Sequence, residues 1–134
     1  MPNAHAEAQL FRKFAELAKL LNIYLNHFPK AEKYALCQRI RNTAYEMYDL
    51  VTEGQKRYHK KTTLSALDIT HERLRMQLHL AYELGYFRFK DGRKHEEHGV
   101  AIEEKRYLTI SAMVDELGRL IGGWIQKIKE ENRW

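Results

Sequence analysis

Apolar residues recur at spacings of three and four along most of this chain, which is the periodicity of one face of a helix. The pattern predicts four helices, at about residues 8–27, 30–58, 64–87 and 109–130. Short links join the first three, so consecutive helices are expected to pack as antiparallel neighbours. With two prolines and seven glycines in 134 residues, these runs leave little room for strands. The sequence therefore predicts a single all-α domain over residues 1–134, an antiparallel up-down-up-down four-helix bundle.

Three glycines, Gly118, Gly122 and Gly123, lie inside the amphipathic pattern of the predicted fourth helix. A glycine inside a helix costs about 1 kcal/mol relative to alanine, so three of them require a compensating reason. Gly118 and Gly122 are one turn apart and, with Trp124 beside them, form a smooth strip against which another backbone can pack closely. The helix is either a tightly packed core helix or one that also packs against a second subunit.

The apolar stripes are wider than the roughly 100° that a single core requires. Phe11, Leu50 and Leu108 are among the residues that flank these stripes. Such residues are either exposed singly, which is common, or buried against other copies of the chain. We expect assembly into a ring-shaped homo-oligomer, with Gly118, Gly122 and Trp124 at the interface.

The one long connection that the pattern predicts, residues 90–106, is polar and contains His95-Glu96-Glu97-His98. Metal sites in helical bundles use Glu-x-x-His pairs that face the core from at least two helices, and no predicted helix carries a matching pair. A solvated charged loop is therefore the favoured interpretation. The chain also lacks a glycine-rich phosphate loop after a strand, and no serine or cysteine has an evident base. We predict no catalytic, cofactor-binding or metal-binding residue, and we expect the protein not to be an enzyme.

Cys37 is the single cysteine and cannot form an internal disulfide, which favours a reducing cytoplasm. The N-terminal residues lack the basic-then-apolar order of a signal peptide. No segment approaches the roughly 18 uninterrupted apolar residues that a membrane span needs. These features predict a cytoplasmic protein that has no membrane partner.

The formal net charge is +5 and the sequence pI is about 9.3, which favours polyanionic partners. The excess is concentrated between residues 30 and 61, which hold eight Lys or Arg against four Asp or Glu. Five residues that are basic or can become so gather at the end of the predicted second helix: Lys56, Arg57, His59, Lys60 and Lys61. Cations at a helix C-terminus cap the helix favourably, but five exceed what capping needs. We expect this cluster, with Arg41 further up the helix, to bind a polyanion or an acidic partner.

The predicted third helix carries a stripe of charged residues beside its apolar seam: Asp68, Glu72, Arg75 and His79. Arg73 adds another cation near this stripe. The composition alone favours a ladder of ion pairs within the helix, each contributing a few tenths of a kcal/mol. The alternative, in which the cations bind a partner, is favoured by a resemblance.

Three blocks of sequence carry this resemblance. Residues 28–36, Phe-Pro-Lys-Ala-Glu-Lys-Tyr-Ala-Leu, are similar to a Pro-Lys-x-x-Lys-aromatic opening of the second helix of a known family. Residues 74–81, Leu-Arg-Met-Gln-Leu-His-Leu-Ala, are similar to its Leu-Arg-x-x-Leu-Arg-Leu-Ala run. Residues 116–125, Glu-Leu-Gly-Arg-Leu-Ile-Gly-Gly-Trp-Ile, match its Glu-Ile-Gly-Arg-x-Leu-Gly-Gly-Trp-Ile ending closely. Over about residues 10–130 the chain thus resembles the four-helix-bundle family of the 23S rRNA intervening-sequence proteins, and within it the Avd-type accessory proteins of diversity-generating retroelements.

The resemblance implies a homopentamer with a basic surface and no catalysis of its own. Such a protein assists a retroelement reverse transcriptase and contacts its template RNA or cDNA during mutagenic retrohoming. Arg75 and His79 occupy the paired basic positions of the family's helix-three motif, although His79 stands where arginine is usual and is only partly charged near neutral pH. The residues expected to contact nucleic acid or the reverse transcriptase are Arg41, Lys56, Arg57, Lys60, Lys61, Arg73, Arg75 and His79.

Two other functions remain as alternatives. A four-helix protein of the 23S rRNA intervening-sequence type, with a structural or ribosome-associated role, shares the fold. A neighbouring reverse-transcriptase gene with variable and template repeats favours the retroelement function, whereas a reading frame inside a large-subunit rRNA gene favours the ribosomal one. The third function, a metal-carboxylate bundle enzyme, requires bound iron or zinc in the purified protein.

Overall fold

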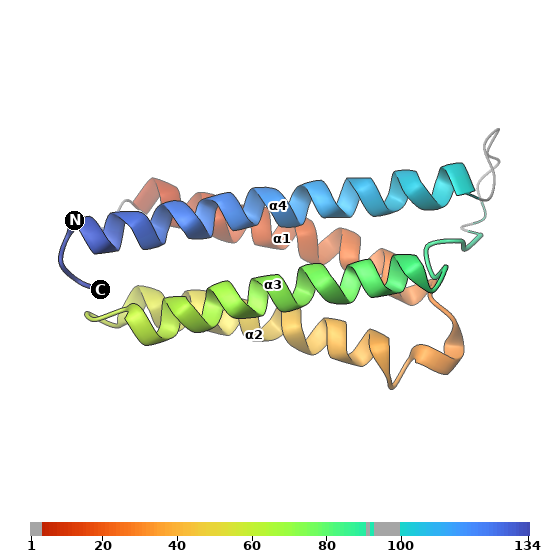
Figure 1. Cartoon of the computed structure of the whole chain (residues 1–134), viewed down its shortest axis with the longest axis horizontal. Helices are drawn as coiled ribbons and strands as arrows, with labels where there is room; N and C mark the ends of the chain where they lie inside the picture. The colour runs from red at the N-terminus through yellow and green to blue at the C-terminus, as the bar shows by residue number, and fades with distance from the viewer. Residues whose placement is uncertain (1–3, 91, 93–99) are drawn as a thin grey trace.

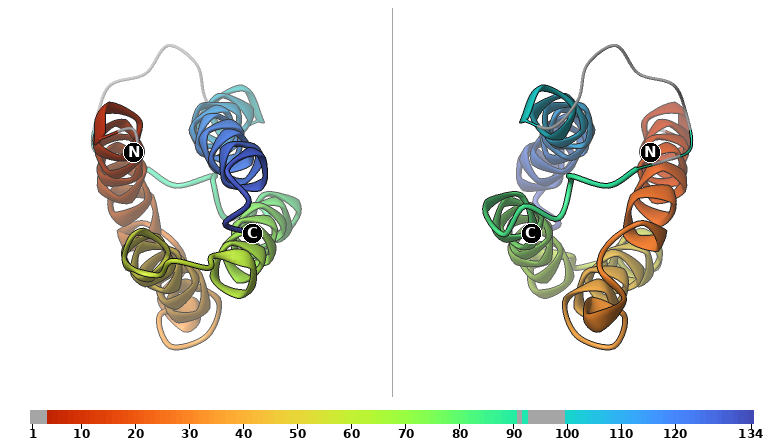
Figure 2. Two further views of the ribbon diagram at one scale, coloured as in Figure 1. Left: turned by 90° about the vertical axis from the view of Figure 1, so that its left-hand side faces the viewer. Right: turned by 90° about the vertical axis from the view of Figure 1, so that its right-hand side faces the viewer.

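The computed structural model describes residues 4–90, 92 and 100–134. Four helices make up most of them: α1 (Ala4–Asn26), α2 (Leu36–Lys56), α3 (Lys61–Glu83) and α4 (Val100–Glu130). Each helix runs antiparallel to the next, and a short 3-10 helix, η1 (Lys30–Glu32), lies in the link between α1 and α2 (Figure 1). Seen end-on, the four helices form the corners of a square in which α1 and α3 are diagonally opposed (Figure 2). The described residues contain no strand, so the predicted all-α four-helix bundle is confirmed.

Each helix turns one apolar stripe toward the axis of the bundle. The largest fully buried side chains of the helices are Leu17, Ile40, Met47, Leu64, Leu67, Leu74, Leu78, Ile110, Val114, Leu117 and Ile121. Phe87, just after α3, is also fully buried and packs edge-on against Tyr24 and Phe28, with ring centroids 5.7 and 5.3 Å apart. The outer faces carry polar residues together with exposed apolar side chains such as Ile23, Ile69 and Leu108. No helix among the described residues has the length and apolar composition needed to cross a membrane.

The link between α1 and α2 differs from the prediction. Pro29 leads into the single turn η1, and α2 begins at Leu36 rather than near residue 30. The Glu32 carboxylate accepts the backbone N–H of Leu36 at 3.0 Å, which satisfies one of the free N–H groups at the start of α2. Its other oxygen accepts the Tyr86 hydroxyl at 3.3 Å, so this turn is tied to the segment that follows α3.

The start of α4 is the largest departure from the predicted boundaries. The helix begins at Val100 rather than near residue 109, so residues 100–106 are helical and do not belong to a polar loop. His95 and His98, which the sequence placed in that loop, lie outside the described residues. The remaining helix boundaries lie within about one turn of those predicted.

The apolar pattern did not predict that residues 100–108 are helical, because two buried charged residues lie among them. Glu103 and Arg106 are both less than a tenth exposed and point into the bundle. Glu103 accepts a hydrogen bond from Nε of Arg88 at 2.6 Å. Arg106 donates to the carbonyl oxygens of Phe87 and Phe89 at 2.8 and 2.7 Å. A charge at an inward position interrupts an apolar stripe without interrupting the helix.

Candidate functional site

The predicted basic cluster lies at the turn between α2 and α3, at one end of the bundle (Figure 1). Its exposed members are Lys56, Arg57, Tyr58, His59 and Lys61. Arg57 is paired with Glu53, one turn earlier in α2, at 3.1 Å. In the part of the chain that the structure describes, Lys56 and Lys61 form no ion pair, so their charges remain free for a partner.

Lys60 differs from its neighbours because its side chain is buried, with 3 % of its surface exposed. Its ammonium donates to the carbonyl oxygen of Gly54 at 2.5 Å and also to that of Arg57, both at the C-terminal end of α2. Burial lowers the pKa of Lys60. Lys60 is therefore a helix cap. This geometry corrects the expectation that Lys60 faces a nucleic acid together with Lys61.

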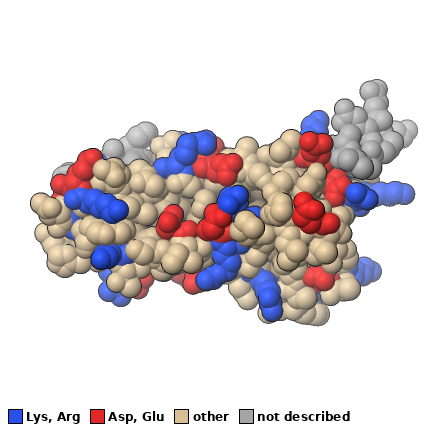
Figure 3. All heavy atoms as spheres, in the orientation of Figure 1, with Lys and Arg blue, Asp and Glu red and all other residues tan. Residues whose placement is uncertain are grey.

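The charged stripe on α3 forms ion pairs within the protomer. Arg75 donates through Nε to Glu72 at 2.9 Å, and this hydrogen bond lowers the pKa of the Glu72 carboxyl. His79 lies 3.5 Å from Glu83, one turn further along. Acidic and basic side chains accordingly alternate along the face of α3 and α4 (Figure 3). A phosphate that bound Arg75 would have to compete with a carboxylate already in place.

Two further arginines that the sequence selected bond to a neighbouring helix. One bonds to a carboxylate and the other to neutral amides. Arg73 of α3 pairs with Glu46 of α2 at 3.1 Å, so its charge is compensated. Arg41 of α2 donates instead to the side-chain oxygens of Asn22 and Asn26 on α1, at 2.6 and 2.9 Å. Amide oxygens accept hydrogen bonds without carrying a negative charge. Arg41 is therefore held in one orientation while its positive charge stays uncompensated.

Gly118 packs against a side chain of its own protomer. A Cβ at this position would lie 2.6 Å from Cε1 and 2.8 Å from Nε2 of His71 on α3, both inside van der Waals contact. The imidazole is held there because its Nε2 lies 2.7 Å from the carbonyl oxygen of Val114. The glycine thus lets α3 and α4 approach closely, as the core-packing interpretation of the sequence expected.

The remaining glycines of α4 are open to solvent, whereas Trp124 packs inside the bundle. A Cβ at Gly122 or Gly123 would meet no atom within 4 Å, and both glycines are exposed. Trp124 is half-buried and packs on Gly54 of α2, where an added Cβ would lie 2.9 Å from its ring. Gly118 and Trp124 therefore have roles within the bundle, and Gly122 is the member of the strip that is open to a neighbour.

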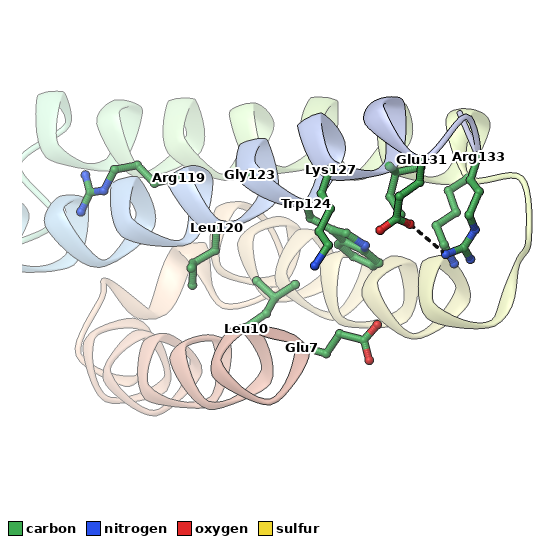
Figure 4. A pocket seen from close by; sticks show the side chains of 11 residues that line it. Glu7, Leu10, Arg119, Leu120, Gly123, Trp124, Lys127, Glu131 and Arg133 are labelled. Atoms are coloured by element: carbon green, nitrogen blue, oxygen red, sulfur yellow. Dashed lines mark hydrogen bonds and ion pairs between the residues drawn. The ribbon is translucent and has the colours of Figure 1, made fainter. Parts of the chain in front are cut away.

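A small cavity of about 190 Å³ lies between the start of α1 and the end of α4. Leu10, Leu120 and Trp124 point into it, whereas Arg119 extends away along the outside of α4 (Figure 4). Glu131 and Arg133, near the chain end, form an ion pair at 3.3 Å beside it. Most of the surface that it exposes is apolar, although charged residues such as Glu7, Lys60 and Lys127 also border it.

Metal-binding or nucleophilic chemistry finds little support in residues 4–90, 92 and 100–134. No three His, Cys, Asp or Glu side chains are grouped there in a way that could hold a metal ion. Cys37 is buried, its thiol lies 3.7 Å from the carbonyl oxygen of Leu25, and burial raises its pKa. A thiol with a raised pKa stays protonated near neutral pH and is a poor nucleophile. The described side chains are suited to ion pairing, hydrogen bonding and packing.

Comparison with known proteins supplies the family. A family model described as bAvd-like matches residues 9–128, which include nearly all of the four helices and all three sequence blocks noted above. No curated protein and no solved structure matches the chain. Because the match covers most of the sequence, the chain belongs to the bAvd-like family.

Proposed function

We propose that this protein is a non-catalytic accessory protein of a diversity-generating retroelement. It binds the reverse transcriptase of that element, and it binds template RNA or cDNA through basic side chains. Membership of the bAvd-like family over residues 9–128 is the observation that carries this proposal. The net charge of +5 supports it, because a basic protein attracts the phosphate backbone without needing sequence-specific contacts.

The free cations at the α2–α3 turn, Lys56 and Lys61, are the proposed phosphate contacts in the basic cluster. Replacing both with glutamine should make the slope of log K against log salt for single-stranded RNA less negative by about 1.4, since each neutralised phosphate contributes about −0.7. Fluorescence anisotropy at several salt concentrations measures this slope. An unchanged slope would show that the cluster does not contact the phosphates.

Lys60 provides the matched control for this experiment, because it is adjacent in sequence but buried. Lys60→Met should leave the salt slope unchanged, since the ammonium does not reach solvent. It should lower the free energy of unfolding by about 1–2 kcal/mol, because the carbonyl oxygens of Gly54 and Arg57 lose their donor. Lys61→Met should show the opposite pattern, with weaker RNA binding and unchanged stability.

Arg75 and His79 are the proposed contacts with the reverse transcriptase. Arg75→Glu should reduce co-purification of the reverse transcriptase of the same element several-fold, because it places two carboxylates side by side where Arg75 now balances Glu72. Arg12→Glu is the matched charge reversal at an exposed position of α1. Equal recovery of the reverse transcriptase with both variants would place the contact elsewhere.

We further propose that the protein assembles as a ring of identical copies, a homopentamer, with Gly122 facing the adjacent copy. A ring requires one surface to meet a different surface of the next copy, and an exposed glycine allows a close backbone approach. The open surroundings of Gly122 support this placement. Light scattering distinguishes such a ring from a 16.0 kDa monomer.

A further inference from the structure

A second basic surface lies at the opposite end of the bundle, where α1 leads through η1 into α2 (Figure 1). An open cleft of about 570 Å³ is formed there by the end of α1, the turn and the first half of α2. This volume is within the range of about 300–1,000 Å³ that is typical of ligand-binding clefts. Among the residues that the structure describes, three cations line the cleft, Lys30, Lys33 and Arg41, and no acidic residue does.

Positive charge exceeds negative charge around this cleft in the described part of the chain. Arg41 is oriented by two asparagine oxygens, which are neutral and leave its charge in place. Glu32, the acidic residue of the turn, also keeps its charge, because its partners are the neutral Leu36 N–H and Tyr86 hydroxyl, but it does not line the cleft. Cys37, which also lines the cleft, stays a neutral thiol because burial raises its pKa. Like-signed charges in a cleft concentrate its field and attract a polyanion.

Two tyrosines give the cleft exposed aromatic surface. Tyr34 has 79 % of its surface exposed and Tyr45 has 59 %, although both are large and partly apolar. Among the described residues neither ring packs on another aromatic ring, and the nearest cation, Nζ of Lys33, lies 5.3 Å from the centroid of Tyr34. Rings exposed in this way beside cations are the arrangement on which successive bases of a single strand stack.

Amide side chains complete the lining. Gln38 and Asn42 lie along the exposed side of α2 between the two tyrosines and can donate to and accept from the edges of bases. An acidic peptide would use the cations alone and would leave both rings uncovered. The combination of rings, amides and an excess of cations therefore favours nucleic acid over protein as the occupant.

We propose that this cleft binds single-stranded nucleic acid, with bases stacked on Tyr34 and Tyr45 and phosphates on Lys30, Lys33 and Arg41. The proposal rests on the nucleic-acid binding put forward above and adds a base-stacking site on the first half of the 21-residue helix α2, which is about 30 Å long and separates Tyr34 from the α2–α3 turn. Four of these five residues were not selected from the sequence. Three of them, Lys30, Lys33 and Tyr34, stand in the Pro-Lys-x-x-Lys-aromatic block, which served only as a mark of the family.

The test measures anisotropy of a short fluorescein-labelled oligouridine with variants that remove the rings or the charges. Tyr34→Leu with Tyr45→Leu should weaken binding by about tenfold or more, because two stacked bases are lost. Tyr34→Phe with Tyr45→Phe keeps both rings and should bind nearly as well as the unmodified protein. Lys30→Gln with Lys33→Gln should make the slope of log K against log salt less negative by about 1.4. All these positions are exposed, and circular dichroism melting curves check that the variants fold.

The outcomes separate this proposal from the proposed function. If the unmodified protein fails to bind the oligonucleotide even at low salt, nucleic-acid binding itself is wrong. If it binds and the leucine variant binds equally well, only the stacking site is wrong. Polyglutamate is the probe for an acidic protein partner. If the lysine variant loses polyglutamate binding while oligouridine binding is unaffected, the cleft is a protein-docking surface and the proposal is overturned.

Discussion

Replacing Gly118 with alanine is expected to lower the free energy of unfolding by about 1–2 kcal/mol, although the same change inside most helices raises it. The added Cβ would lie 2.6 Å from Cε1 of His71, so the imidazole must move. Moving it breaks the contact between its Nε2 and the carbonyl oxygen of Val114. The strain and the lost hydrogen bond outweigh the gain of about 1 kcal/mol in helix propensity. Urea unfolding at a fixed protein concentration measures the difference.

Gly123 is the matched control because it lies on the same helix, is exposed and is not assigned to the proposed ring interface. A Cβ there meets no atom within 4 Å, so Gly123→Ala should raise the free energy of unfolding by about 0.5–1 kcal/mol through helix propensity alone. Two identical substitutions five residues apart should thus have opposite signs. If Gly118→Ala stabilised the protein as much as Gly123→Ala, the close packing of α3 on α4 would be wrong.

A second substitution tests whether His71 is the cause. In a His71→Ala background the imidazole is absent, so adding the Cβ at position 118 should no longer be destabilising. The free-energy cost of Gly118→Ala should fall to zero or reverse, which gives an interaction energy between the two sites of about 1–3 kcal/mol in a double-mutant cycle. Simple additivity of the two changes would exclude a direct clash.

Replacing Arg106 with methionine is expected to lower the free energy of unfolding by about 2–4 kcal/mol. The guanidinium donates to the carbonyl oxygens of Phe87 and Phe89, and it lies 3.8 Å from the centroid of the Phe89 ring. Without it, one buried and one partly buried carbonyl oxygen lose a charged donor, each at a cost of up to about 1.5–3 kcal/mol. Removing a buried charge recovers part of this cost, since its desolvation is no longer required. Thermal and urea unfolding measure the net effect.

Two controls define the role of Arg106. Lys105→Met removes an exposed charge from the preceding position and should change the free energy of unfolding by less than about 0.5 kcal/mol. Arg106→Lys keeps the charge but has no planar group, so it should recover only part of the stability. If Arg106→Met unfolded at the same urea concentration as the unmodified protein, Arg106 would not be what anchors the segment after α3 to α4.

The sequence could not show which of the predicted basic residues are free to bind a partner. Lys60 and Lys61 are adjacent and chemically identical, so no pattern of residue types could separate them. The end of α2 and the start of α3 place one ammonium against carbonyl oxygens and the other in water. Arg73 and Arg41 were likewise equivalent as cations. The helix packing gave Arg73 a carboxylate and gave Arg41 two neutral amides.

The sequence alone determined the number of helices, their antiparallel order and the family, because hydrophobic periodicity and short links are local properties of the chain. It also located the excess of positive charge. Only the tertiary structure decided which charges are free and which glycine packs against His71. It also decided that the side chains of Glu103 and Arg106 are buried in a continuous helix. These outcomes depend on the register between helices distant in sequence, since burial and pairing are set by which side chains face each other across the bundle.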